Sequence, residues 1–126
     1  MKRPAFMGML GFSIYRADEH EAVVRMDVPG ALITPLGTVH GGVIAALFDT
    51  GLAIAIARRL SGLDRIATHS LTVSYVAFSR GPVLFCRARV VSLRRSVATV
   101  EGEVVAESGA LVAKALGTFA VRRHAA

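Results

Sequence analysis

The residues best suited to chemistry are the run His40-Gly41-Gly42 and one carboxylate, Asp49, eight residues after Gly41. The stretch that holds them is apolar and long enough for one helix of several turns. The free N–H groups and the positive dipole end at a helix start bind oxyanions, and glycines let a ligand or another chain approach the backbone. A carboxylate in apolar surroundings must be hydrogen-bonded, be protonated or face a cavity. The pattern therefore predicts an anion site beside His40 and a functional carboxylate within the helix.

The helix expected to position these groups spans residues 41–60 and is apolar on every side apart from Asp49. A helix that is hydrophobic all round is buried all round, and Gly62 is suited to end it. Patterns typical of strands cover residues 9–15, 21–28, 66–78, 83–93, 96–106 and 110–121. Short turns join the last four strands, which are therefore antiparallel.

A single helix is enclosed on all sides only when the sheet curls about it. The sequence therefore predicts an α+β fold in which an antiparallel β-sheet wraps around one long central α-helix, as a single domain over residues 1–126. In the strand expected over residues 66–78, apolar and hydroxyl side chains alternate along the sequence. The two kinds therefore lie on opposite faces of the sheet. The hydroxyl-bearing face then carries Thr68, Ser70, Thr72 and Ser74.

The composition limits the classes of partner. Hydrophobic residues make up 53% of the 126 residues, which is high for one small domain and predicts that surface is hidden in an oligomer. The net charge of +6 comes largely from arginines scattered singly or in pairs, without a Lys/Arg-rich run and without tryptophan for stacking. This pattern disfavours nucleic acid as a partner. A few convergent arginines suit a smaller polyanion equally well, such as a nucleotide-bearing ligand.

The location that the sequence favours is the cytoplasm, without membrane attachment. Asp49 and Arg58 interrupt the apolar helix, so no run reaches the ~18 uncharged apolar residues of a membrane span. The first residues, MKRPAFMGM, faintly resemble a signal peptide, but Pro4 and the lack of a clear cleavage site argue against secretion. The single cysteine, Cys86, gives no disulfide framework and is expected to pack in a buried strand. Residues 122–126 are expected to form a frayed tail.

The motifs around the helix start carry a family resemblance. The segments GTVHGG (residues 37–42) and AALFDT (residues 45–50) resemble the signature of hotdog-fold acyl-CoA thioesterases, in the PaaI-type branch of the 4-hydroxybenzoyl-CoA thioesterase superfamily. The resemblance covers nearly the whole chain, from the first hairpin to Val121. It implies a hotdog fold, hydrolysis of an acyl-CoA to free acid and CoA, and a homo-oligomer, with no cofactor and no metal.

The resemblance also implies roles for individual residues. Asp49 matches the catalytic carboxylate, acting as general base on water or as nucleophile, and the Gly41 N–H matches the group that polarises the thioester carbonyl. His40 matches the motif histidine, which orients the loop or the thioester. Thr68 aligns with a strand hydroxyl that positions water near the acid. Thr34 stands where many relatives carry Asn or Gln, and its hydroxyl has a shorter reach than an amide.

The substrate is expected to be an acyl-CoA with an aromatic or medium-to-long-chain acyl group. Its acyl pocket is expected to be apolar and lined partly by the helix around Phe48, Leu52 and Ile56, with Gly42 as a further substrate-binding residue. Coenzyme A is expected to enter at strand ends, where at least one of three arginines contacts phosphate. The residues predicted there are Arg80, Arg94, Arg95 and Ser96.

Helix geometry adds a point that does not depend on the resemblance. Eight residues of α-helix rise about 12 Å, so the Gly41 N–H and Asp49 of one chain cannot both touch one carbonyl. If both groups are catalytic, each site takes Gly41 from one subunit and Asp49 from another. We therefore expect a dimer with two shared sites, and the family resemblance further implies assembly into a tetramer.

Structural interpretations of the same residues remain open at this point. Asp49 would then be a buried acid paired with an arginine, His40 a helix cap, and the two glycines a site of close packing. A non-catalytic acyl-CoA binding or sensing protein is the alternative function. Dehydratase or hydratase chemistry on an acyl thioester is disfavoured, because the HGG helix does not match the histidine and acid that it needs. No Cys/His cluster with metal-ligand spacing and no nucleophile elbow is present.

Overall fold

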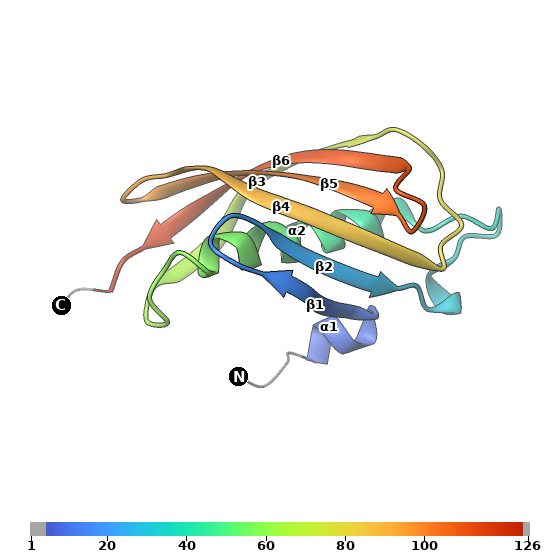
Figure 1. The fold of residues 1–126 in the computed structure, drawn as a ribbon, viewed down its shortest axis with the longest axis horizontal. Helices are drawn as coiled ribbons and strands as arrows, with labels where there is room; N and C mark the ends of the chain where they lie inside the picture. The colour runs from blue at the N-terminus through green and yellow to red at the C-terminus, as the bar shows by residue number, and fades with distance from the viewer. Residues whose placement is uncertain (1–4, 125–126) are drawn as a thin grey trace.

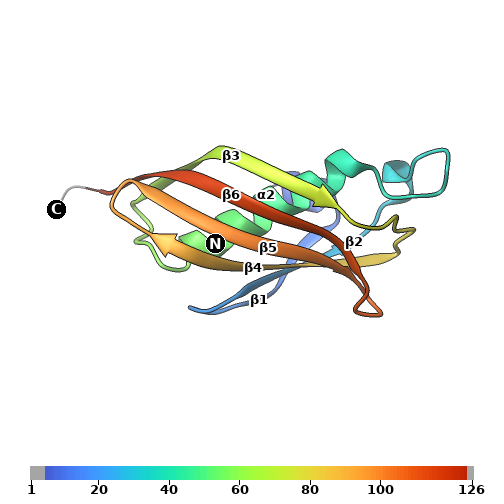
Figure 2. The same cartoon turned by 90° about the horizontal axis from the view of Figure 1, so that it is seen from above.

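The computed structural model describes residues 5–124, and its centre is one long helix laid against one sheet (Figure 1). Six antiparallel strands form the sheet in the order β1-β2-β4-β5-β6-β3, which Figure 2 shows from above. The elements in chain order are α1 (Ala5–Met9), β1 (Phe12–Ala17), β2 (Ala22–Asp27), a 3-10 turn η1 (Gly30–Leu32), α2 (Gly41–Ala57), β3 (Arg65–Tyr75), β4 (Val83–Leu93), β5 (Val97–Ala106) and β6 (Leu111–Arg122). The predicted α+β hotdog architecture is confirmed.

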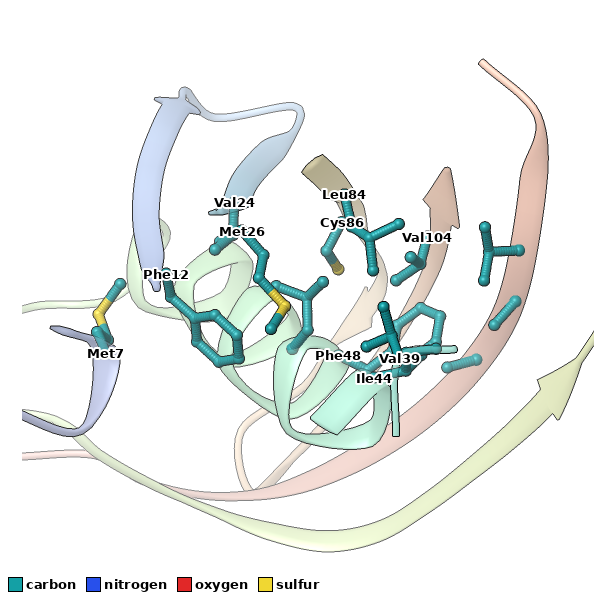
Figure 3. Close-up of a cluster of buried hydrophobic side chains, with 14 residues drawn as sticks. Met7, Phe12, Val24, Met26, Val39, Ile44, Phe48, Leu84, Cys86 and Val104 are labelled. Carbon is teal, nitrogen blue, oxygen red and sulfur yellow. The ribbon is translucent and has the colours of Figure 1, made fainter. Parts of the chain in front are cut away.

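The core lies between α2 and the concave face of the sheet. Figure 3 shows Phe48 of the helix beside Val104 of β5, with Cys86 of β4 close by. One stripe of the helix is buried there, made up of Ile44, Leu47, Phe48, Gly51, Leu52, Ala55 and Ile56. The opposite side, including Gly42, Asp49 and Ala53, is exposed or half-buried. The expectation that this helix is buried on all sides is therefore wrong for a single chain, because the sheet covers only one side of it.

The ends of several elements differ from the predictions. The helix α2 ends at Ala57 with Arg58 as its C-cap, so the expected end near Gly62 is wrong. The short helix α1, which buries Met7, has no counterpart among the predicted elements. The prediction of a frayed tail over residues 122–126 is also wrong for its residues up to His124. The His124 N–H donates to Asp64 Oδ1 at 2.8 Å. Lys2, Arg3 and residues 125–126 lie outside the described residues. No helix within the described part of the chain is long and apolar enough to span a membrane.

A β-bulge in β3 changes which face Thr68 occupies. Thr68 pairs with Phe119 of β6 and Ser70 pairs with Thr118, so His69 is the extra residue. Because one extra residue moves the following side chains to the opposite face, Thr68 lies on the same side of the sheet as α2. Ser70 lies on the outer side, with its hydroxyl 2.7 Å from that of Thr118. Uninterrupted alternation, which put Thr68 beside Ser70 on one face, is wrong at this point.

Cys86 is a packing residue, as the sequence predicts. It is fully buried, and a Cβ added to Gly51 of α2 would lie 2.7 Å from its Sγ. Glycine at position 51 therefore lets the helix approach β4 closely. Burial raises the pKa of the Cys86 thiol from 9.0 to about 12, because the thiolate would lose its hydration.

This shift predicts a pH dependence of stability. Above pH 9 the unfolded chain releases the Cys86 proton while the folded chain keeps it until about pH 12. The free energy of unfolding should therefore fall across this range, by up to ~1.4 kcal/mol per pH unit more than in Cys86→Ala. Urea unfolding of both proteins at a series of alkaline pH values measures the difference. The small cavity left by Cys86→Ala lowers the free energy of unfolding by a similar amount at every pH. If the plots of this free energy against pH ran parallel for the two proteins, they would therefore contradict the prediction.

Candidate active site

The start of α2 has one backbone donor to spare. The Gly42 N–H donates to His40 Nδ1 at 2.9 Å, and the N–H groups of Val43 and Ile44 donate to the His40 carbonyl at 3.0 and 3.2 Å. The Gly41 N–H meets no acceptor within residues 5–124. A helix start holds partial positive charge, so this free N–H is suited to an anionic or carbonyl oxygen.

The two glycines make room for two aromatic rings at the helix start. A Cβ on Gly42 would lie 3.2 Å from His40 Nδ1, and a Cβ on Gly41 would lie 3.5 Å from the Tyr75 ring. Tyr75, the last residue of β3, also donates its hydroxyl hydrogen to the Gly41 carbonyl at 2.6 Å. His40 is the N-cap of the helix, so its capping role is a property of the fold, whatever else it does.

Asp49 lies half-buried in the middle of α2 and has a hydroxyl donor from the sheet. Thr68 Oγ1 donates to Asp49 Oδ1 at 2.6 Å, which is short for an O–H···O bond and typical of a carboxylate acceptor. None of the ion pairs within residues 5–124 involves Asp49. The interpretation in which an arginine neutralises Asp49 thus finds no support within residues 5–124. A partly accessible carboxylate with one hydroxyl donor is suited to accept a proton from water or to attack a carbonyl.

Three other predicted residues make their hydrogen bonds or packing contacts elsewhere. The Thr34 hydroxyl is 3.0 Å from that of Thr38 and accepts from the N–H of Leu36 at 3.3 Å, so it holds its own loop together. Phe48 and Leu52 are fully buried and face the sheet, where both lie next to the Cα of Gly102. Within one chain they belong to the core rather than to an open pocket.

Two of the three predicted residues at the β4–β5 turn border an open basic groove of about 690 Å³. Arg95 and Ser96 line it, together with Arg65 from the start of β3 and Arg122 and Arg123 from the end of β6. Arg123 fixes the turn by donating to the carbonyls of Arg94 at 3.1 Å and Arg95 at 3.3 Å. Among the described residues no acidic side chain lines the groove, so the charged groups along it are all arginines.

Arg80 lies elsewhere, in the loop between β3 and β4. Its Nη1 approaches Gly37 in the loop that precedes α2, and the neighbouring Ser79 accepts the Val39 N–H at 2.8 Å. Arg80 therefore lies near the helix start, whereas the basic groove lies near the Arg65 end of β3. One chain thus presents arginines at both ends of its edge strand.

Sequence reasoning missed four residues that the structure places at these positions. The arginine pair 122/123 was visible as a charge cluster but was assigned to a frayed tail, and Arg65 stood at a predicted strand start without a partner. Tyr75 lies within the strand predicted over residues 66–78, and the sequence pattern gives it no role. Its contact with Gly41 joins residues 34 positions apart, which no local spacing indicates.

Comparison with known proteins identifies the family that this chain matches and several solved structures that it resembles. Residues 36–113 match the family model described as the thioesterase superfamily. The TT0310 protein of Thermus thermophilus is 35% identical, with 98% of this chain and 100% of that chain covered and a TM-score of 0.84. A mutant of the phenylacetic acid degradation protein PaaI from the same organism is 34% identical (96% and 100% covered, TM-score 0.83). A putative thioesterase of Ralstonia eutropha JMP134, related to phenylacetic acid degradation, is 29% identical (95% and 92% covered, TM-score 0.89). No curated protein sequence gave a significant match.

Proposed function

The chain belongs to the thioesterase superfamily, and from this premise we propose that it is an acyl-CoA thioesterase acting on an aromatic or medium-to-long-chain acyl group. One observation carries the proposal. The helix α2 combines a free Gly41 N–H at its start with a partly accessible Asp49 carboxylate that accepts from Thr68. Two relatives are named for phenylacetic acid degradation, which favours aromatic substrates as the first to test.

The proposed chemistry needs one attacking group and one oxyanion donor. Asp49 takes a proton from water, and the resulting hydroxide attacks the thioester carbonyl carbon. The Gly41 N–H stabilises the oxyanion of the tetrahedral intermediate, whose collapse breaks the C–S bond and releases CoA thiolate. In the alternative, Asp49 attacks directly and forms an acyl anhydride that water then hydrolyses. Both routes use the same two groups, and Thr68 orients the carboxylate in either.

The two groups come from different subunits in this proposal, because they are separated by about 12 Å of helix. The strand β3 supports this arrangement. It lies at one end of the sheet, is 11 residues long and has no buried residue, so its edge is open to another chain. Antiparallel pairing of two β3 edges about a twofold axis would place the Tyr75 end of one strand beside the Arg65 end of the other. Gly41 of one subunit then approaches Asp49 of its partner.

The same pairing supports a role for the arginines. The Arg65 end of β3 borders the basic groove, and it would lie next to the partner's Arg80. The phosphates of coenzyme A would then meet Arg95 from one subunit and Arg80 of the partner subunit at one entrance, with Arg94 and Ser96 on the turn beside them. We further expect two dimers to associate as a tetramer. On the half-buried side of α2, the apolar residues nearest Asp49 are Ala45 and Ala53. These two residues are the candidates for contact with the acyl group.

Thiol release from a panel of thioesters tests the proposal. The panel comprises phenylacetyl-CoA, benzoyl-CoA and straight-chain acyl-CoAs from butyryl to palmitoyl, each beside the matching N-acetylcysteamine thioester, which lacks the phosphates. We expect turnover of at least one CoA thioester and a much higher KM for its phosphate-free analogue. Tight binding of acyl-CoA without hydrolysis of any thioester would refute the enzyme and favour the binding or sensing protein. Crotonyl-CoA and 3-hydroxybutyryl-CoA complete the panel, and hydration of the first or dehydration of the second, seen by mass spectrometry, would refute both.

A further inference from the structure

Tyr75 makes the link between the edge strand and the helix start. It is the last residue of β3, its side chain is half-exposed, and its hydroxyl donates to the Gly41 carbonyl at 2.6 Å. That carbonyl belongs to the same peptide group as the Gly42 N–H, which donates to His40 Nδ1 at 2.9 Å. These two hydrogen bonds, joined by the peptide group, link the Tyr75 hydroxyl to the His40 ring.

The direction of these hydrogen bonds determines which nitrogen of the His40 imidazole carries the hydrogen. A peptide group whose oxygen accepts a hydrogen bond donates more strongly through its N–H, since successive hydrogen bonds polarise one another. The Gly42 N–H needs a bare nitrogen as its acceptor, so Nδ1 of the neutral ring carries no hydrogen and Nε2 carries it. His40 therefore presents an Nε2–H donor at the helix start, in the same turn as the free Gly41 N–H.

We propose that Tyr75 is a positioning residue, which holds the first turn of α2 against β3 and keeps His40 in the Nε2–H form through the Gly41–Gly42 peptide. The kinetic part of this inference rests on the proposed thioesterase function, whereas the structural part does not. Gly41 has two tasks in this arrangement, because its carbonyl receives Tyr75 while its N–H remains free for the substrate. Without the tyrosine hydroxyl, the turn that carries the free N–H would be less well ordered.

The substitution Tyr75→Phe tests this role by removing a single oxygen. We expect kcat on the best CoA thioester to fall roughly 2–10-fold, the range for one lost hydrogen bond, with little change in KM. The matched control is Tyr15→Phe. The Tyr15 hydroxyl has no hydrogen-bond partner within residues 5–124, and its ring packs edge-on against Phe85 at a centroid distance of 5.3 Å.

The decisive readout is the tautomer of His40, measured from the ring ¹⁵N signals of labelled protein. Wild type and Tyr15→Phe should show Nδ1 as the bare nitrogen, whereas Tyr75→Phe should show a larger share of the other tautomer and faster amide exchange at Gly42. The variant Gly42→Ala breaks the hydrogen-bonded link at its other end, since the added Cβ would lie 3.2 Å from Nδ1, and should change the same signals.

The possible results distinguish failure of the Tyr75 inference from failure of the proposed thioesterase function. Unchanged His40 signals and Gly42 exchange in Tyr75→Phe would overturn the inference, as would a change in KM alone. If the wild-type protein hydrolyses no thioester, the proposed function fails while the ¹⁵N comparison still decides whether Tyr75 controls His40.

Discussion

Replacing Asp49 by asparagine is expected to lower kcat on the best acyl-CoA by roughly 10²–10⁴-fold, the cost of losing a general base or a nucleophile. The amide has the shape of the carboxylate, and its oxygen still accepts from Thr68, which lies 2.6 Å from Asp49 in the wild type. It cannot take a proton from water at neutral pH or form an acyl anhydride. The fold, the oligomer and the affinity for CoA should therefore stay close to wild type while turnover collapses.

The control for Asp49→Asn is the same chemical change at an acid on the outer face of the sheet. Glu101 pairs with Arg89 at 3.2 Å, and its side chain is 49% exposed, so Glu101→Gln removes one negative charge outside the proposed site. Its kcat should match that of wild type. Steady-state thiol release by the three purified proteins, with their oligomeric state measured in parallel, gives the comparison. Equal losses in both variants, or near-wild-type turnover by Asp49→Asn, would remove Asp49 from the mechanism.

The fold was largely predictable because periodicity alone specifies most of its elements. The strand β4 has the bounds expected from the sequence, Val83–Leu93, since apolar residues and turn residues delimit it clearly. The surroundings of α2 were not predictable in the same way. The uniform hydrophobicity of α2 indicates that every side of the helix is shielded from water. It does not indicate whether the same chain or another subunit covers each side. The sheet covers one side, and the other is left half-buried in a single chain.

The site was predictable only where its residues are close in sequence. Gly41 and Asp49 belong to one helix and His40 caps it, so spacing and chemistry were enough to single them out. The contact of Thr68 with Asp49 depends on the bulge at His69. Nothing in the local sequence marks this bulge, and simple alternation puts Thr68 on the wrong face. Tyr75 and Arg123 act through contacts across 34 and 28 positions, which only the folded chain brings together.

The substitution Gly41→Pro should abolish the proposed oxyanion donor without removing the helix. Proline lacks an N–H and is favoured at the first position of a helix, and the extended backbone of His40, with φ −60° and ψ 132°, suits a residue before proline. We expect kcat to fall roughly 10²–10³-fold, as for loss of one oxyanion donor. The matched variant Gly41→Ala keeps the N–H, and its Cβ would make ordinary contact with Tyr75 at 3.5 Å. Its loss should be much smaller, and equal losses in both variants would point to packing rather than to the N–H.

Mixing two inactive variants then tests whether the site is shared between subunits. A heterodimer of Gly41→Pro with Asp49→Asn contains one site with both substitutions and one site with neither, provided that each site takes Gly41 from one chain and Asp49 from the other. Random exchange makes half of the dimers mixed, so co-refolding equal amounts should restore about a quarter of wild-type activity. If both groups acted within one chain, every site would keep one substitution and the mixture would stay inactive. Because the helix separates the two groups by about 12 Å, recovery of activity is the outcome that we expect of a thioesterase built on this helix.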